Sequence, residues 1–168
     1  MRNRRPTAPF LLILLGIVVC LGCKKAKPDS KNLVDTGTPI NLSAIVGSNQ
    51  VQMFSEAKRP GLLPRPVVDY FNQSDGIAGP GEDFNLGDFI DSRVPSRMFV
   101  TAAVSRQYCI VSYWQGGFTV RFQTDIFELS DSKAKLIWVS DQQGGFNFRD
   151  LKEMVESGRM HNDLDKKL

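Results

Sequence analysis

The stretch "YCIVSYWQGGFTVRFQTDIFEL", residues 108–129, decides the fold class that this chain can adopt. It contains two runs rich in β-branched and aromatic residues, the composition typical of β-strands. The Gly116-Gly117 pair between them suits a two-residue hairpin turn, because both positions can adopt a positive φ. The stretch therefore predicts two antiparallel strands with the opposed pairs Tyr113–Val120, Val111–Phe122 and Cys109–Thr124.

Similar runs continue on both sides of this hairpin. "MFVTAAVS" precedes it with a turn at Arg106-Gln107, and "KLIWVS" follows it after a four-residue turn from Ser130 to Lys133. The three turns agree on one apolar face, and a one-residue slip in any of them would break that agreement. We therefore predict a four-stranded antiparallel meander over about residues 97–140, with the further opposed pairs Val104–Cys109, Ala102–Val111, Val100–Tyr113, Ile126–Ile137 and Thr124–Val139.

Two helices are predicted from local signals. "PVVDYFNQ", residues 66–73, has proline in its first turn and places Val67, Tyr70 and Phe71 on one face. A second helix over about residues 148–157 has Asn147 as its N-cap and Gly158 as its stop, with a buried stripe and a hydrophobic staple. The stripe consists of Phe148, Leu151 and Val155, and the staple pairs Phe146 with Leu151. The fold class is α+β, with residues 38–95 as a mixed N-terminal layer.

Ahead of this domain, residues 11–25 read "LLILLGIVVCLGCKK", an apolar run that ends in two cysteines and two lysines. As a helix, the run from Phe10 to Gly22 would span about 20 Å, which is short of the roughly 30 Å hydrocarbon core of a bilayer. Basic residues precede the run and no acidic residue does. The segment is therefore typical of a signal peptide rather than of a membrane-spanning helix.

The end of that segment, Cys20-Leu21-Gly22-Cys23, resembles the cleavage motif of bacterial lipoproteins. Gly22 and Cys23 match the motif, whereas Cys20 and Leu21 stand where it usually has leucine and a small residue. The resemblance implies cleavage before Cys23, lipidation of Cys23 and loss of Cys20 with the signal. Two alternatives stay open: an uncleaved single-pass anchor and an unlipidated secreted protein.

This interpretation sets the layout of the chain: a lipoprotein signal peptide (1–22), a flexible lysine-rich tether (23–37), a single α+β domain (38–158) and a frayed polar tail (159–168). Lys24, rather than aspartate, follows the lipidated cysteine, which favours the outer membrane over the cell membrane where a bacterium has both. The domain then faces the periplasm or the exterior.

Removing the signal also removes the basic excess. Three of the 21 basic residues lie in the signal, so the remaining 18 balance the 18 acidic residues. The mature chain is formally neutral, and we expect no nucleic-acid partner. The membrane is the expected partner of the lipid.

Few residues offer chemistry. Cys109 is the remaining thiol, and the predicted register places it on the buried face of the sheet. His161 is the single histidine. The loop "GEDFNLGDFID" carries weak calcium-ligand candidates, Asp83, Asn85 and Asp88, but lacks the later positions of an EF-hand loop. Its carboxylates Glu82, Asp83, Asp88 and Asp91 leave open a hydrolase as the alternative function. We predict no cofactor, no metal site and no catalytic residue.

The second face of the predicted sheet is too apolar for a solvated surface. Either residues 38–95 cover it, or it binds a protein, glycan or lipid partner through aromatic side chains. The residues concerned are Tyr108, Ile110, Trp114, Phe127, Leu136 and Trp138. The sequence therefore predicts a membrane-anchored envelope lipoprotein with a small, non-catalytic binding or scaffolding domain.

Overall fold

The computed structural model describes residues 37–47, 51–87, 91–141 and 143–164 of the 168-residue chain. The predicted signal peptide (1–22) and all of the predicted tether except Gly37 lie outside these residues. The described residues belong to one compact unit, Val34–Leu168. No helix within them is long and apolar enough to cross a membrane.

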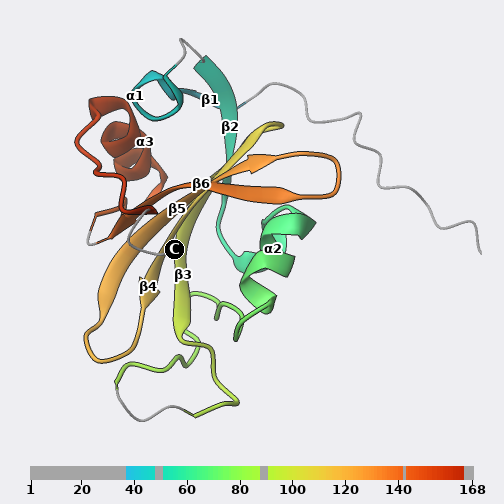
Figure 1. The fold of residues 1–168 in the computed structure, drawn as a ribbon, viewed down its shortest axis with the longest axis vertical. Coiled ribbons are helices and arrows are strands. Elements are labelled where there is room, and N and C mark those ends of the chain that lie inside the picture. Colours follow the sequence, from blue (N-terminus) through green and yellow to red (C-terminus); the bar gives the residue numbers. More distant parts are fainter. Residues whose placement is uncertain (1–36, 48–50, 88–90, 142, 165–168) are drawn as a thin grey trace, which may run out of the picture. The chain divides into compact units, whose positions relative to one another are not determined.

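Six strands form one antiparallel sheet in which each strand lies beside its neighbours in sequence (Figure 1). The strands are β1 (Thr38–Asn41), β2 (Val51–Ala57), β3 (Arg97–Val104), β4 (Tyr108–Gln115), β5 (Arg121–Leu129) and β6 (Ala134–Asp141). The helical elements are α1 (Ser43–Val46), the 3₁₀ turn η1 (Pro60–Leu62), α2 (Arg65–Asn72) and α3 (Phe148–Ser157).

The predicted α+β class is confirmed, and the predicted four-stranded meander corresponds to β3–β6. The strand count was too low, because β1 and β2 extend the same sheet. β2 connects β1 to the predicted meander. Its first half pairs with β1, with Phe54 opposite Thr38, and its second half pairs with β3, with Ser55 opposite Val104. Short apolar runs in residues 38–57 therefore form sheet rather than a separate layer.

The predicted register of the central hairpin is wrong by three residues. Gln115 pairs with Arg121, so a five-residue loop, Gly116–Val120, replaces the two-residue glycine turn. Gly116 is instead required by a neighbouring loop, since a Cβ there would lie 1.5 Å from the carbonyl oxygen of Asn85. Because the shift is by an odd number of residues, each β5 side chain lies on the opposite face of the sheet from the one predicted. Tyr113 opposes Gln123, Val111 opposes Asp125 and Cys109 opposes Phe127.

The β3–β4 and β5–β6 pairs each contain one register shift, and the predicted pairings are correct on only one side of it. The pairs Val104–Cys109 and Ala102–Val111 are confirmed, but a register shift between Phe99 and Thr101 places Phe99, not Val100, opposite Tyr113. The turn from Ser130 to Lys133 is confirmed by the Leu129–Ala134 pair. A shift between Ile126 and Phe127 makes the other two predicted pairs wrong: Ile126 opposes Trp138, and Thr124 opposes Ser140.

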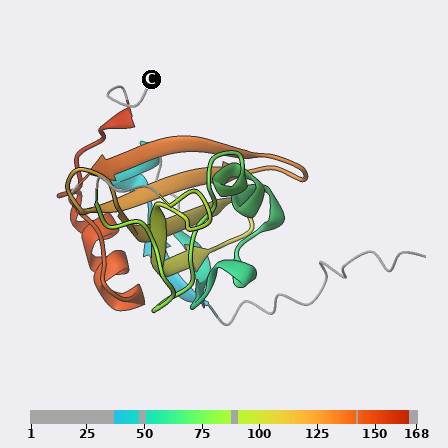
Figure 2. The ribbon, with the colours of Figure 1, turned by 90° about the horizontal axis from the view of Figure 1, so that it is seen from below.

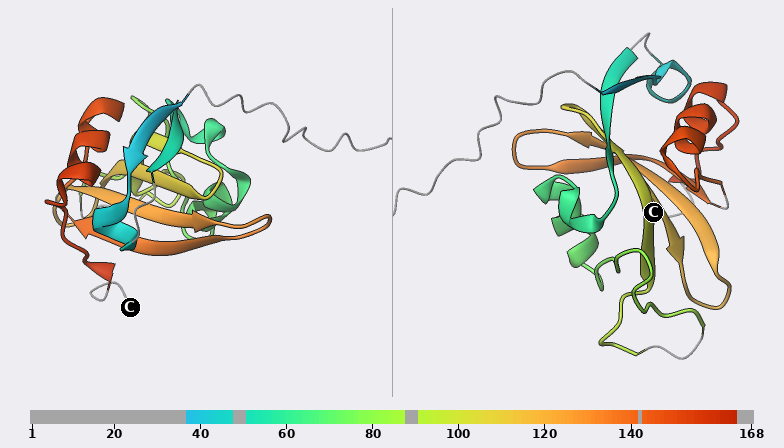
Figure 3. Two further views of the ribbon diagram at one scale, coloured as in Figure 1. Left: turned by 90° about the horizontal axis from the view of Figure 1, so that it is seen from above. Right: turned by 180° about the vertical axis from the view of Figure 1, so that it is seen from behind.

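Both faces of the sheet are covered. Figures 2 and 3 show α3 and α2 on opposite sides of it. On one face, Leu151 and Val155 of α3 pack with Ile110 and Ile126. On the other, the α2 side chains Val67 and Phe71 pack with residues of β3, β4 and β5 that include Phe99, Val111 and Phe127. The sheet is thus the middle layer between two apolar cores.

The two helices form where the local signals predict them. Val67 and Phe71 of α2 are buried, as the spacing of apolar residues predicts. The Asn147 side chain accepts a hydrogen bond from the Asp150 amide at 3.0 Å and caps α3, and Gly158 ends it with φ 63°. Phe146, which the predicted staple pairs with Leu151, is largely exposed and packs on the Phe122 ring.

The C-terminal segment is ordered as far as the structure describes it. Met160 is buried in the α3-side core. The Asp163 amide donates to the Val139 carbonyl at 2.6 Å, and the Asp163 carboxylate accepts from the Asp141 amide at 3.1 Å. The prediction of a frayed tail is therefore wrong for residues 159–164, because this segment covers part of the β6 edge that would otherwise be unpaired.

Candidate functional site

The six residues predicted as a binding face do not form one surface. Tyr108 and Ile110 are buried in the α3-side core, against which Trp138 packs. Phe127 and Leu136 belong to the α2-side core, on the opposite face of the sheet. The indole nitrogen of Trp138 is buried without a hydrogen-bond partner among the described residues. Only Trp114 lies close to an exposed aromatic group, described below.

Hydrogen bonds of Asn85 organise the described part of the acidic loop between α2 and β3. The buried Asn85 amide donates to the carbonyls of Asp91 at 3.0 Å and Val94 at 2.5 Å, while its oxygen accepts from the Asp91 amide at 3.0 Å. Asp83 is exposed, and Asp88 lies outside the described residues. Among the described residues, no three histidine, cysteine or carboxylate groups are placed to hold a metal ion.

The described carboxylates of this loop do not converge. Glu82 accepts a hydrogen bond from the Gly79 amide at 2.6 Å, which closes a local turn. Asp91 forms an ion pair with Arg93 at 2.7 Å. Each carboxylate thus bonds to its own segment, and the structure shows no acid–base pair among Glu82, Asp83 and Asp91.

Cys109 is enclosed in the α2-side core, as the sequence predicts. Burial raises the pKa of its thiol far above the ordinary value. Nucleophilic chemistry needs the thiolate, which this environment disfavours. The single histidine, His161, is exposed in the segment that follows α3. The structure therefore assigns Cys109 to packing.

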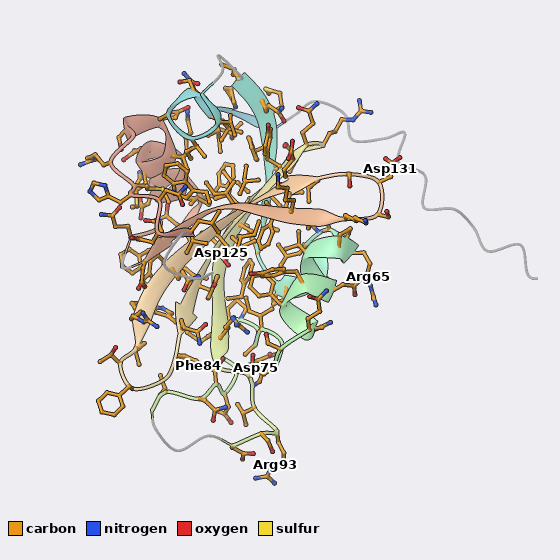
Figure 4. The ribbon with its side chains drawn as sticks, in the orientation of Figure 1. Arg65, Asp75, Phe84, Arg93, Asp125 and Asp131 are labelled. Atoms are coloured by element: carbon orange, nitrogen blue, oxygen red, sulfur yellow. The ribbon has the colours of Figure 1, made fainter. Side chains whose placement is uncertain are left out.

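A buried polar network lies on the α2-side face, where the sequence predicted only apolar side chains. The Tyr113 hydroxyl donates to an Asp125 carboxylate oxygen at 2.9 Å and accepts from the Gln123 amide at 2.5 Å. Gln123 also donates to the other Asp125 oxygen at 2.6 Å. Figure 4 places Asp125 in the middle of the sheet, and its side chain has no exposed surface.

The electrostatics of this network favour a structural role. Burial, the charge of Asp125 and the hydrogen bond to it together raise the pKa of Tyr113 well above its ordinary value. Partial burial and the same charge raise the pKa of Tyr70 on α2, while Arg97 acts in the opposite sense. Both phenols therefore stay protonated. The signal that could have revealed the network is the spacing of Gln123 and Asp125 in "FQTDIF", since residues two apart lie on the same face of a strand.

Arg97 connects α2 to the sheet. Its guanidinium donates to Asp75 at 2.7 Å and to the Ser74 hydroxyl at 2.8 Å, and it lies 5.9 Å from the centre of the Phe71 ring. Partial burial alone would raise the pKa of Asp75, but hydrogen bonds from Ser96 and the charge of Arg97 lower it. This group fixes the end of α2 to the start of β3.

An aromatic cluster lies at the far end of β4 and β5. Trp114 and Phe122 are directly opposed, with ring centres 4.8 Å apart at 72°. Phe146 packs on both, 4.7 Å from Phe122 and 6.1 Å from Trp114. Gly144 permits this close approach, since a Cβ there would lie 2.2 Å from the Phe122 ring. The cluster thus joins the α3 connection to the hairpin.

Phe146 of this cluster and three other large apolar side chains at this end of the hairpin are exposed, and we call these four side chains the hairpin-tip patch. Its members and exposed fractions are Phe118 (91%), Phe146 (64%), Leu86 (59%) and Val120 (43%). Phe118 and Val120 belong to the hairpin loop, and Leu86 follows Asn85, which contacts Gly116 of that loop. Monomeric soluble proteins rarely expose apolar groups together unless they contact something.

Three cavities of the described surface lie away from this patch. One of about 580 Å³ lies between β2 and the β3–β4 turn, with Arg106 as the one charged residue among those that line it. Its polar side chains bond to one another: Gln52 accepts from the Ser105 hydroxyl at 3.0 Å and contacts Gln107. Two smaller cavities, of about 340 and 290 Å³, lie beside α2 and η1. None of the three is lined by the hairpin-tip patch.

Comparisons with known proteins give no relative for this chain. No family model, no curated protein and no solved structure matches it.

Proposed function

We propose that this chain is a bacterial envelope lipoprotein, held to the membrane by a lipid on Cys23, whose domain acts by binding or scaffolding rather than by catalysis. The pattern of residues 11–25 supports the anchor. The observation that carries the binding role is the hairpin-tip patch, where exposed apolar side chains surround a packed aromatic cluster. Lys24 after the lipidated cysteine supports the outer membrane in a bacterium that has one.

Three features support a role without catalysis. Cys109 is enclosed, and its thiol pKa is raised by burial. Glu82 and Asp91 are bonded within their own loop. Asp125 is fully buried and bonded to Tyr113 and Gln123. These four described groups therefore stabilise the fold through packing or local bonding.

The anchor is tested by two cysteine variants of the full chain expressed in a bacterium. Cys23→Ser removes the lipidated thiol, so the protein should leave the detergent-rich phase after detergent phase separation. Cys20→Ser is the matched control, since Cys20 is discarded with the signal and the variant should partition like the original chain. If loss of Cys20 abolishes partitioning and loss of Cys23 does not, the proposed site is wrong.

A further inference from the structure

We propose that the hairpin-tip patch is a second membrane contact, in which Phe118, Val120 and Leu86 insert into the surface of the bilayer that holds the lipid anchor. This inference rests on the proposed anchor at Cys23. It assigns a specific ligand, a lipid bilayer, to the patch.

The loop has the chemistry of an interfacial insertion. Gly116–Val120 carries no charged residue, and Phe118 is almost fully exposed. The next residue, Arg121, is held in an ion pair with Asp141 at 2.8 Å. A protruding, uncharged apolar loop fits a deformable bilayer surface, whereas a protein partner would need a matching pocket of its own.

The loop rests on a packed base. Trp114, Phe122 and Phe146 pack edge to face or tilted beneath it. The Asn85 carbonyl packs against Gly116 at the start of the loop, where no side chain would fit. Because both strands beside the loop and its first residue are packed in this way, Phe118 is presented to the bilayer with little further loss of conformational freedom. Aromatic side chains are also favoured at the membrane–water boundary.

The tether is long enough for both contacts. The loop lies at the opposite end of the sheet from β1, where the tether joins the domain (Figures 1 and 3). Thr38 lies one step beyond the Ser55–Val104 pair, about eight steps along β3 from the Arg97–Gln115 pair, and Phe118 is three residues past Gln115. These eleven steps correspond to at most roughly 36 Å. The fourteen residues from Lys24 to Gly37 can span at most about 46–50 Å. The chain can therefore pass along the whole domain and leave the hairpin tip at the bilayer.

The contact should be apolar rather than electrostatic. The neighbouring loop carries exposed Glu82 and Asp83, and its Arg93 is paired with Asp91. Anionic lipid is attracted by clusters of basic residues, which this end of the domain lacks among its described residues. Insertion should therefore occur into zwitterionic phosphatidylcholine and should persist at high salt.

The test uses an environment-sensitive fluorophore on the full lipidated chain in phosphatidylcholine vesicles. Thr119→Cys places one thiol in the loop, and Ser132→Cys places the control at the exposed β5–β6 turn. Cys109 is enclosed and Cys23 is acylated, so the introduced thiol is the one that reacts. We expect a blue shift at position 119 that high salt does not reverse, and no shift at position 132.

Additional variants separate insertion from anchoring. Phe118→Ser should abolish the blue shift, while the matched exposed change Leu62→Ser should preserve it, and both proteins should still float with the vesicles. Flotation without a shift at position 119, or a shift that requires an added envelope protein, would overturn the inference and leave the anchor in place. Failure to float, together with labelling of Cys23, would overturn the anchor itself.

Discussion

At the scale of single residues, a network of polar side chains is buried in the α2-side core, which the sequence predicts to be apolar. Asp125 lies opposite Val111 and receives hydrogen bonds from Tyr113 and Gln123. No local pattern identifies those partners, because they depend on a register three residues away from the one that the glycine pair suggests. The prediction that Cys109 is buried is correct despite the register error, since both faces of β4 are covered.

Tyr113→Phe should destabilise the domain more than Tyr70→Phe. The first change leaves a buried Asp125 oxygen without its phenol donor, which costs about 1–3 kcal/mol. Tyr70 is half-buried on α2 and lies outside the hydrogen-bond network of Tyr113, Gln123 and Asp125, so removing its hydroxyl should cost less. Urea unfolding measures both free energies. Equal losses would show that the network does not stabilise the fold.

Asp75 should contribute to acid sensitivity. Its folded-state pKa lies below the ordinary value because hydrogen bonds from Ser96 and the charge of Arg97 outweigh partial burial. Its stabilisation is therefore present above about pH 4 and is lost as the pH falls through the lowered pKa. Asp75→Asn should lower the melting temperature at neutral pH and reduce the further drop on acidification. A variant with an unchanged acid profile would contradict this role.

At the scale of elements, local signals predict the helices, and long-range contacts decide the central hairpin. α2 and α3 begin and end where proline, Asn147 and Gly158 indicate. Gly116 suggests a tight turn, but the structure uses it for the approach of Asn85. A sequence pattern cannot distinguish a glycine that turns the chain from one that makes room for a distant loop.

Gly144→Ala should test the contact between the α3 connection and β5. A Cβ at this position would lie 2.2 Å from the Phe122 ring and 2.5 Å from the Thr124 hydroxyl, so overpacking should cost about 1–3 kcal/mol. Gly61→Ala is the control, because nothing lies within 4 Å of its added Cβ. Chemical unfolding should leave the control within about 0.5 kcal/mol of the original chain. A neutral Gly144→Ala would refute the close packing.

At the scale of the whole molecule, the described domain covers both sheet faces and exposes apolar groups at a few places. α2 and α3 cover the faces, and residues 162–164 lie along β6. Four of the exposed large apolar residues belong to the hairpin-tip patch. The anchor stays a prediction from a local motif. The sequence did not indicate the hairpin-tip patch, because its members meet only through the observed register.

The lipid anchor at Cys23 is the central claim, since it places the domain at a membrane and gives the hairpin-tip patch its ligand. Mass spectrometry of the N-terminal peptide of protein purified from bacterial membranes tests it most directly. We predict a peptide that begins at Cys23 and carries the mass of a diacylglyceryl group on that residue. A peptide that retains Met1, or one with an unmodified Cys23, would contradict the claim.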